Sequence, residues 1–191
     1  MKRSLMALLV ALAGSVLSTA SGQTAIQIPL LNPGFEEDVL GCGPGCSEVS
    51  ITGWLCGPSS GTFKPAAAQF PGGVPSGVNV AFVGNAYSTG SIMQVAPVHL
   101  SANNTYTLKL SIGHRADYAF TGYFAALMAG NVVLAYDSSL NPAPGTWMED
   151  VIVYKSGNNP PQYDQPITIF IKSLGTGQVE IDDVLLTDVV R

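Results

Sequence analysis

Short apolar segments with strand-like alternation recur along the sequence after residue 22, and no segment there shows helical periodicity. In the clearest segment, 105–113, Tyr106, Leu108, Leu110 and Ile112 alternate with mostly polar residues, as in a half-buried strand. Turn-forming residues are abundant, with 21 Gly and 13 Pro. This pattern predicts an all-β fold, a two-sheet antiparallel β-sandwich of the jelly-roll type.

The expected strands and loops follow from the same pattern. Gly130-Asn131 is a two-residue hairpin signal between two apolar runs. The segment 64–78 is rich in Pro and Gly and is expected to be a loop. The segments expected to be strands are 25–31, 49–56, 79–83, 91–95, 105–113, 123–129, 132–136, 146–155, 166–172 and 178–188.

Residues 1–22 have the features of a secretory signal peptide. Lys2 and Arg3 precede an apolar run from Leu5 to Leu17, and small residues follow it. The run is too short to span a bilayer comfortably. We therefore expect a secreted protein, extracellular or periplasmic, in which residues 23–191 form one jelly-roll domain.

The charge balance argues against two classes of partner. Removal of Lys2 and Arg3 with the leader leaves 6 basic against 13 acidic residues, a net charge of −7. Nucleic acids and anionic membranes are bound through basic patches, so neither is an expected partner. An acidic protein is compatible with a small neutral or apolar ligand and with divalent cations.

The three cysteines all lie early in the sequence. Gly-Pro-Gly between Cys42 and Cys46 permits a tight turn, and export favours a disulfide, so we predict that these two pair. Cys56 is expected to remain a free thiol. A zinc site is not expected, because nearby His and a fourth ligand are lacking.

Carboxylates stand beside large apolar residues at both ends of the expected domain. Glu36 follows Phe35 near the start, and Asp182 and Asp183 lie between Ile181 and Val184 near the end. Buried carboxylates are costly unless they are paired or bind a metal. We therefore predict that the two ends meet and that Glu36, Asp182 and Asp183 bind a structural calcium ion, which prefers oxygen ligands. Strict strand alternation makes Asp183 the more buried aspartate.

Several motifs resemble the galactose-binding-like jelly rolls, in particular carbohydrate-binding modules of families four, nine and twenty-two. These are Asn32-Pro33-Gly34-Phe35-Glu36, Gly53-Trp54 and Ile181-Asp182-Asp183-Val184. The resemblance covers nearly the whole expected domain. It implies the jelly-roll fold and a role in recognising a glycan or a related small ligand.

The run Gly113-His114-Arg115-Ala116-Asp117-Tyr118-Ala119-Phe120-Thr121-Gly122-Tyr123 resembles a narrower group. These are the exported calcium-containing cyclases of cyanobacterial indole-alkaloid biosynthesis, the Stig cyclases. This resemblance implies acid-promoted rearrangement and cyclisation of a prenylated indole, with a carboxyl group of the terminal strand as the proton donor. Asp182 matches that role by its place in the motif, whereas strand alternation favours Asp183.

Aromatic and polar residues between the expected strands are candidates for ligand binding, because aromatic rings stack on sugars and also form apolar pocket walls. The candidates are Tyr87, Arg115, Asp117, Tyr118, Phe120, Tyr123 and Trp147. Core packing is the alternative for any of these rings.

Three functions are compatible with these features. The leading hypothesis is an exported, calcium-stabilised module that binds a glycan or a small neutral ligand. The second is a cyclase with Asp182 or Asp183 as the general acid. The third is a surface or matrix protein without a small-molecule site.

Overall fold

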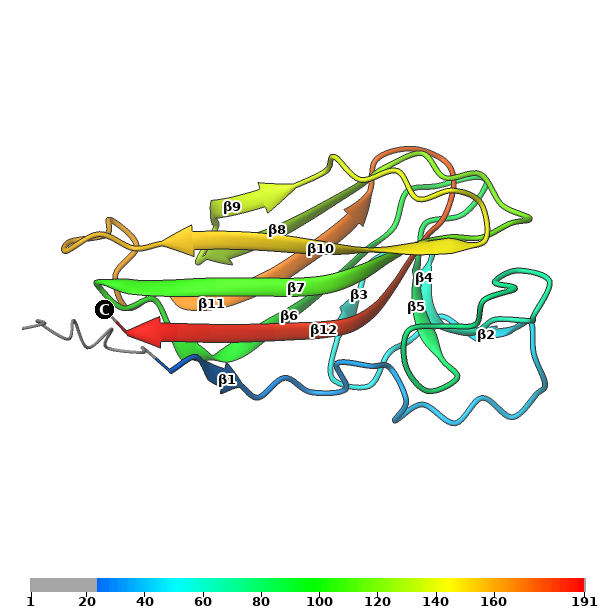
Figure 1. Ribbon diagram of the computed structural model, residues 1–191, viewed down its shortest axis with the longest axis horizontal. Coiled ribbons are helices and arrows are strands. Elements are labelled where there is room, and N and C mark those ends of the chain that lie inside the picture. The colour runs from blue at the N-terminus through cyan, green and yellow to red at the C-terminus, as the bar shows by residue number, and fades with distance from the viewer. Residues whose placement is uncertain (1–23, 191) are drawn as a thin grey trace, which may run out of the picture.

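The computed structural model describes residues 24–190 and consists of two antiparallel sheets packed face to face (Figure 1). The seven-stranded sheet has the order β10-β7-β12-β5-β4-β2, with β1 also paired to β12, and the five-stranded sheet has the order β3-β6-β11-β8-β9. The strands are β1 (Ile26–Ile28), β2 (Cys46–Glu48), β3 (Leu55–Cys56), β4 (Ser60–Lys64), β5 (Val80–Val83), β6 (Ser91–His99), β7 (Asn104–His114), β8 (Tyr123–Ala129), β9 (Val132–Asp137), β10 (Thr146–Lys155), β11 (Pro166–Ser173) and β12 (Val179–Val190).

This architecture confirms the predicted all-β sandwich. The predicted signal peptide, 1–22, lies outside the described residues. Within residues 24–190 no helix has the length and apolar character needed to cross a membrane.

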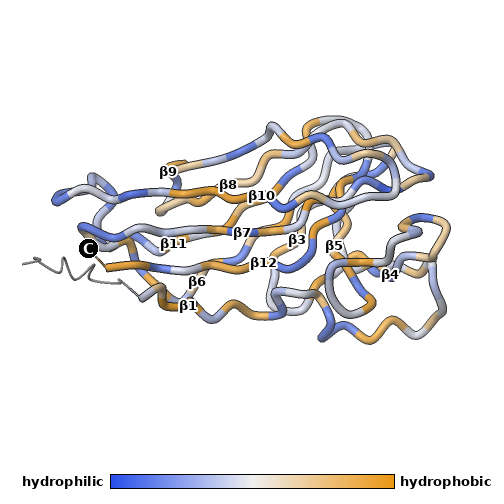
Figure 2. Tube along the Cα trace, in the orientation of Figure 1, coloured by the Kyte–Doolittle hydropathy of each residue, from blue (hydrophilic) through white to orange (hydrophobic). Residues whose placement is uncertain are grey.

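The main core lies between the two sheets. It contains the predicted alternating residues of β7, from Tyr106 to Ile112, together with Ile167, Ile169 and Ile171 of β11. Full burial of such a side chain contributes about 1.5–3 kcal/mol, so the alternation fixes which face of each strand turns inward. In Figure 2 the apolar colour follows the strands of both layers, whereas the loop after β10 is hydrophilic.

The prediction of one strand over 49–56 is wrong, because the chain crosses between the sheets within this segment. β2 pairs with β4 in the larger sheet, and β3 pairs with β6 in the smaller one. Between them Trp54 N–H donates to the Ile51 carbonyl, and Gly53 has a positive φ of 80°. Trp54 Nε1 also donates to the carbonyls of Leu31 and Asn32, which anchors the crossing.

The two ends of the domain meet, as the sequence predicts. β1 pairs antiparallel with β12, with Ile26 opposite Asp188. Further along, Val184 N–H donates to the Pro33 carbonyl at 3.0 Å. The Asn32–Glu36 motif therefore lies beside the terminal strand. The predicted disulfide between Cys42 and Cys46 is also present, and Cys56 is a free, half-buried thiol.

Candidate functional site

Strand β12 carries two buried carboxyl groups on the outer face of the larger sheet. Val179 and Ile181 belong to the core between the sheets, so Glu180 and Asp182, which alternate with them, point the other way. Both acidic side chains are nevertheless fully buried. Something must therefore cover this part of the outer face.

The cover has two parts. Phe63, Val80 and Phe82 form a second apolar cluster, separate from the main core, against which Val74 and Trp147 pack. We call these five residues the outer-face cluster. Residues 65–79, which form no strand, lie across this face and are called the cover segment. Phe82 pairs with Glu180 across β5 and β12, so the cluster is adjacent to the buried carboxyl groups.

Trp147 fastens the cover segment to the sheet. Its ring stacks on Phe70 with centroids 4.6 Å apart, and its Nε1 donates to the Gly73 carbonyl at 3.2 Å. A Cβ at Gly113 would lie only 2.6–2.8 Å from atoms of the Trp147 ring. Because Gly113 pairs with Trp147 on one side and Glu180 on the other, its missing side chain lets the ring extend towards Glu180.

Asp182 is hydrogen-bonded to the cover segment. Its Oδ2 accepts from Ser76 N–H at 2.9 Å, and its Oδ1 accepts from the Ser76 hydroxyl at 3.2 Å. Burial raises the pKa of this carboxyl to about 7, which hydrogen bonds from Ser76 and Asp183 only partly offset. Asp182 can therefore hold or release a proton near neutral pH.

The prediction that Asp183 is the more buried aspartate is wrong. Asp183 is exposed and has a positive φ of 50°, while Asp182 has no exposed surface. The register between β12 and β7 shifts between Asp182 and Leu185. This bulge interrupts the strict alternation on which the prediction depended.

Glu180 has no hydrogen-bond donor for either carboxylate oxygen, although it is completely buried. The guanidinium Nε of Arg115 lies 4.0 Å from Oε1, which is beyond hydrogen-bonding distance. Burial raises the pKa of this carboxyl well above its usual range and outweighs the positive charge of Arg115 and the nearby backbone N–H groups of Arg115 and Glu180, which lack hydrogen-bond geometry. Glu180 is thus a buried carboxyl group without the hydrogen bonds that would offset its loss of hydration.

Arg115 is held firmly by other partners. Its Nε and Nη2 donate to Asp117 at 3.0 and 2.9 Å, and Nη1 donates to Gln178 at 2.6 Å. Its guanidinium also lies over the rings of Phe63 and Tyr118, 4.7 and 5.0 Å from their centroids. Of the residues predicted to bind a ligand, Arg115 and Trp147 therefore lie beside the buried carboxyl groups.

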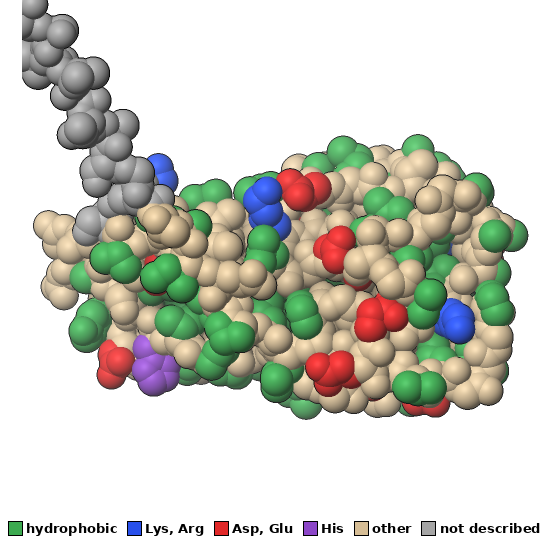
Figure 3. All heavy atoms as spheres, turned by 60° about the horizontal axis from the view of Figure 1, so that its bottom comes forward, with side chains coloured by type: hydrophobic (Ala, Val, Ile, Leu, Met, Phe, Trp, Pro, Cys, Tyr) green, Lys and Arg blue, Asp and Glu red, His purple; other side chains and the backbone are tan. Residues whose placement is uncertain are grey.

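Glu36, the third predicted calcium ligand, reaches the same cover segment. Its Oε1 accepts from the backbone N–H groups of Val78 and Asn79 at 2.9 and 2.7 Å. Within residues 24–190, however, no three His, Cys, Asp or Glu side chains lie close enough together to hold a metal ion. The carboxylates as placed accept N–H donors and do not form a ready set of calcium ligands, so calcium stays a prediction. On the face shown in Figure 3, acidic side chains outnumber basic ones on the half away from the grey trace.

Two other predicted ligand residues line a separate groove. Asp117 and Tyr118 border a surface hollow of about 360 Å³, together with Ala86, Ala119 and 176–177. The Tyr118 hydroxyl accepts from Ala86 N–H at 2.7 Å. Tyr87, which follows Ala86 in the sequence, is 91% exposed. Neither Glu180 nor Asp182 lines this groove.

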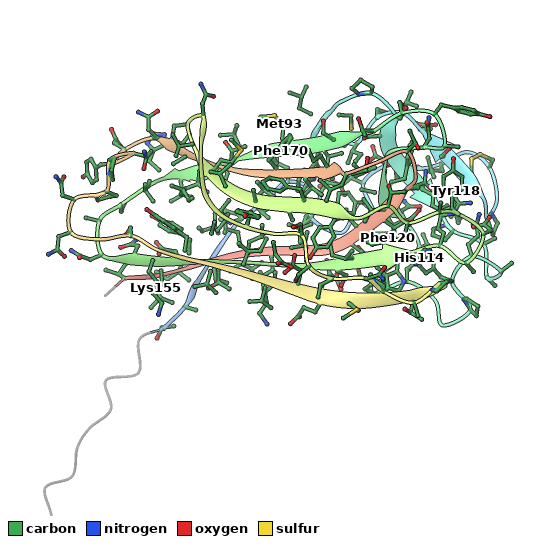
Figure 4. The ribbon with its side chains drawn as sticks, turned by 90° about the horizontal axis from the view of Figure 1, so that it is seen from above. Met93, His114, Tyr118, Phe120, Lys155 and Phe170 are labelled. Carbon is green, nitrogen blue, oxygen red and sulfur yellow. A yellow bond between two sulfur atoms is a disulfide. The ribbon has the colours of Figure 1, made fainter. Side chains whose placement is uncertain are left out.

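Tyr123 and Phe120 belong to the interior of the sandwich, so the structure does not place them with Glu180 and Asp182. Tyr123 is fully buried in the main core, and its hydroxyl lies within hydrogen-bonding distance of Asp137 and Asp150. Phe120 packs against the same core and stacks on His114, with centroids 5.2 Å apart. Figure 4 shows His114 and Phe120 together at one end of the sandwich, with Met93 and Phe170 on the smaller sheet.

Sequence reasoning identified Trp147 as a candidate but did not identify Glu180, Phe63, Phe70 or Phe82 as parts of the site. Glu180 carried a usable signal, because it shares one strand face with Asp182. Phe63, Phe70 and Phe82 carried none, since their contacts join three segments that are separate in the sequence.

Comparison with known protein families gives one match. The family described as HpiC1-like, HpiC1 cyclase, matches residues 26–187. Comparison with curated protein sequences finds no match.

Several solved structures share the fold. The Stig cyclase Fisc from Fischerella sp. TAU, in complex with (3Z)-3-(1-methyl-2-pyrrolidinylidene)-3H-indole, is 24% identical with a TM-score of 0.78, covering 88% of this chain and 100% of that one. A cyclase from the same organism, in complex with 4-(1H-indol-3-yl)butan-2-one, is 24% identical with a TM-score of 0.75, covering 87% and 99%. The carbohydrate-binding module TmCBM61, in complex with beta-1,4-galactotriose, is 17% identical with a TM-score of 0.54, covering 83% and 97%.

The leading hypothesis of a glycan-binding module is therefore wrong. The family match is to a cyclase, and the likeness to a carbohydrate-binding module is a likeness of fold. The motifs around Asn32, Gly53 and Asp182 position the ends of the jelly roll, which both groups share. In addition, the Trp147 ring already packs against the cover segment. It is therefore not free to stack on a sugar.

Proposed function

The chain belongs to the HpiC1 cyclase family, and we propose that it catalyses the acid-promoted rearrangement or cyclisation of a small, largely apolar substrate of the indole type. Related Fischerella cyclases have been solved with indole compounds bound, which supports this substrate class. The observation that carries the proposal is the buried Asp182 on the terminal strand, with a pKa of about 7.

In this proposal Asp182 is the proton donor. A carboxyl group with this pKa is about half protonated at neutral pH, and proton donation by a positioned side chain contributes about 10²–10⁴-fold to a rate. The hydrogen bonds from Ser76 stabilise the carboxylate that remains after the proton has left. Ser76 thus stabilises Asp182 after the proton has been donated.

The outer-face cluster supplies the rest of the environment. Its rings, Phe63, Phe82 and Trp147, provide apolar walls beside β12. Exclusion of water from such a pocket strengthens electrostatic interactions and protects a cationic intermediate from capture by water. Because Asp182 is fully buried, the substrate reaches it only when the cover segment moves away from the sheet. Export, which the predicted leader favours, is part of the same proposal.

The decisive experiment is turnover of a prenylated indole by the purified protein, with products analysed by mass spectrometry and NMR. Asp182→Asn removes the acidic proton but keeps an oxygen for Ser76, so the rate is expected to fall at least about 100-fold. Asp164→Asn is the matched control, since Asp164 is exposed and has the positive φ of 62° that Asn tolerates.

Two results would overturn the proposal. One is an Asp182→Asn variant that turns over as fast as the control. The other is a wild-type protein that neither binds nor converts prenylated indoles, which is what the third hypothesis, a surface or matrix protein, predicts.

A further inference from the structure

The unpartnered carboxyl group of Glu180 is the least satisfied polar group in the outer-face site. Both of its oxygens are buried without a hydrogen-bond donor. Among residues 24–190 the only other buried side-chain polar atom in this condition is a single oxygen of Asp188. Buried polar groups in folded proteins nearly always have a partner, so this exception needs an explanation.

The neighbouring cation does not provide that partner. The single hydrogen of Arg115 Nε points to Asp117, at 3.0 Å, and Nη1 and Nη2 donate to Gln178 and Asp117. Two aromatic rings, those of Phe63 and Tyr118, hold the guanidinium between these partners. The two remaining N–H hydrogens of Arg115, one on Nη1 and one on Nη2, do not bond Glu180 either, since both of its oxygens lack a partner.

The groups around Glu180 indicate what kind of molecule would satisfy it. Phe82 on β5 pairs directly with Glu180, and the Trp147 ring lies over Gly113, its partner on β7. A ligand here would therefore meet aromatic walls and one hydrogen-bond acceptor. At least one oxygen of Glu180 can accept a hydrogen bond whether or not the group is protonated, so an N–H donor suits it in either state.

We propose that Glu180 binds the ring N–H of a planar heteroaromatic substrate and so orients that substrate towards Asp182. The inference rests on the proposed function and adds a positioning residue to it. Glu180 and Asp182 share one strand face two residues apart, a spacing of about 7 Å along the strand. A bicyclic ring anchored by its N–H at Glu180 would thus extend along β12 to the proton donor.

The cover segment controls access to this position. Two hollows border it: one of about 370 Å³ lined by 64–67, Phe70 and Val78, and one of about 410 Å³ lined by Pro71 and Trp147. The bonds that hold the segment over the two carboxyl groups are those of Trp147 with Gly73 and of Ser76 with Asp182, and its ends are held by bonds of Gln69 with Ala116 and of Val78 and Asn79 with Glu36. Displacement of this segment exposes Glu180 and Asp182 together.

The test compares two ligands of nearly equal size, indole and benzofuran, in which oxygen replaces the N–H group. Calorimetric titration of the wild-type protein should give at least about tenfold tighter binding of indole, because benzofuran leaves Glu180 without a donor. Glu180→Met should abolish this preference, and Glu180→Gln, which keeps an acceptor oxygen, should retain most of it. Glu149→Gln, an exposed change on β10 of the same sheet, is the matched control.

A purely structural role for Glu180 would change stability but not the ratio of the two affinities, so the ratio is the decisive measurement. Equal affinities in the wild-type protein, a preference that survives in Glu180→Met, or no binding of either ligand would overturn the inference. Turnover of a prenylated indole without an indole preference would leave the proposed function standing and remove the role of Glu180. An indole preference without any turnover would leave Glu180 as a site for the ring N–H and would contradict the proposed catalytic function.

Discussion

The backbone N–H of Ser76 lies 2.9 Å from Oδ2 of Asp182, and this hydrogen bond joins the cover segment to the terminal strand. The two residues are 106 positions apart in the sequence. The bond connects the proposed proton donor with the segment that buries it. Opening of the cover and the protonation of Asp182 are therefore linked, because exposure to water lowers the pKa that burial has raised.

The first prediction concerns the dependence of activity on pH. Asp182 donates a proton only in its protonated form, and burial raises its pKa to about 7. Turnover should therefore be highest below pH 7 and should fall about tenfold per pH unit well above it. Initial rates measured from pH 5.5 to 9 test this. A rate that is constant or rises over this range would contradict the role of Asp182 as the acid.

The second prediction concerns Tyr123 and two carboxyl groups. The Tyr123 hydroxyl lies 2.7 Å from Asp137 Oδ2 and 2.8 Å from Asp150 Oδ2, yet it has one hydrogen to donate. Burial raises the pKa of Asp150. Burial acts in the same direction on Asp137, but hydrogen bonds from Tyr123 and Ser139 outweigh it and lower that pKa. We expect a protonated Asp150 to donate to Tyr123, which donates to Asp137.

Because the pKa of Asp150 is raised in the folded state, its contribution to stability is present at low pH and is lost as pH rises through that pKa. Each unit of the shift corresponds to about 1.4 kcal/mol. Asp150→Asn keeps a donor for Tyr123 and cannot ionise, so its stability relative to the wild-type protein should increase from pH 4 to pH 8. Urea unfolding at both pH values measures this. An equal difference at the two pH values would be the contrary result.

The third prediction tests the space that Gly113 leaves for Trp147. The Cβ of Gly113→Ala would overlap the indole ring, which must then leave its place beside Glu180. We expect a loss of about 1–3 kcal/mol in unfolding free energy, as for other overpacked sites. The tryptophan fluorescence should change as the stack with Phe70 is disturbed. Gly157→Ala is the control, since a Cβ there meets nothing within 4 Å. Unchanged stability and fluorescence would show that the ring is not confined.

The fourth prediction tests calcium. If calcium binds only the folded protein, a chelator should lower the melting temperature, because a ligand present at 100 times its Kd stabilises by about 2.7 kcal/mol. Glu36→Gln should reduce this response. A melting temperature that changes with neither chelator nor added calcium would show that the prediction of a structural calcium ion is wrong. A response lost in Asp182→Asn would make Asp182 a metal ligand, which must be ionised and could not serve as the proton donor.

The alternation of apolar residues along β7, together with the recurring short apolar segments and the many turn residues, was sufficient to predict a two-sheet sandwich, because side chains in a strand point alternately to opposite faces. The same rule failed at Asp183, where a bulge adds a residue and reverses the faces that follow. A bulge depends on pairing with a neighbouring strand, so its position could not be predicted from local sequence. The sequence identified the acidic motif of the terminal strand, but it did not predict which of the two aspartates is buried.

The sequence by itself determined the fold class and the pairing of Cys42 with Cys46, since both depend on local patterns or short spacings, and the acidic motifs at both ends indicated that the ends meet. Only the tertiary structure decided the composition of the site. Glu180 becomes an unpartnered buried group because Phe82, Trp147 and the cover segment converge on it from separate parts of the chain. Burial of that kind depends on segments far apart in the sequence, so the strand pattern that places Glu180 beside Asp182 does not show that the group is covered.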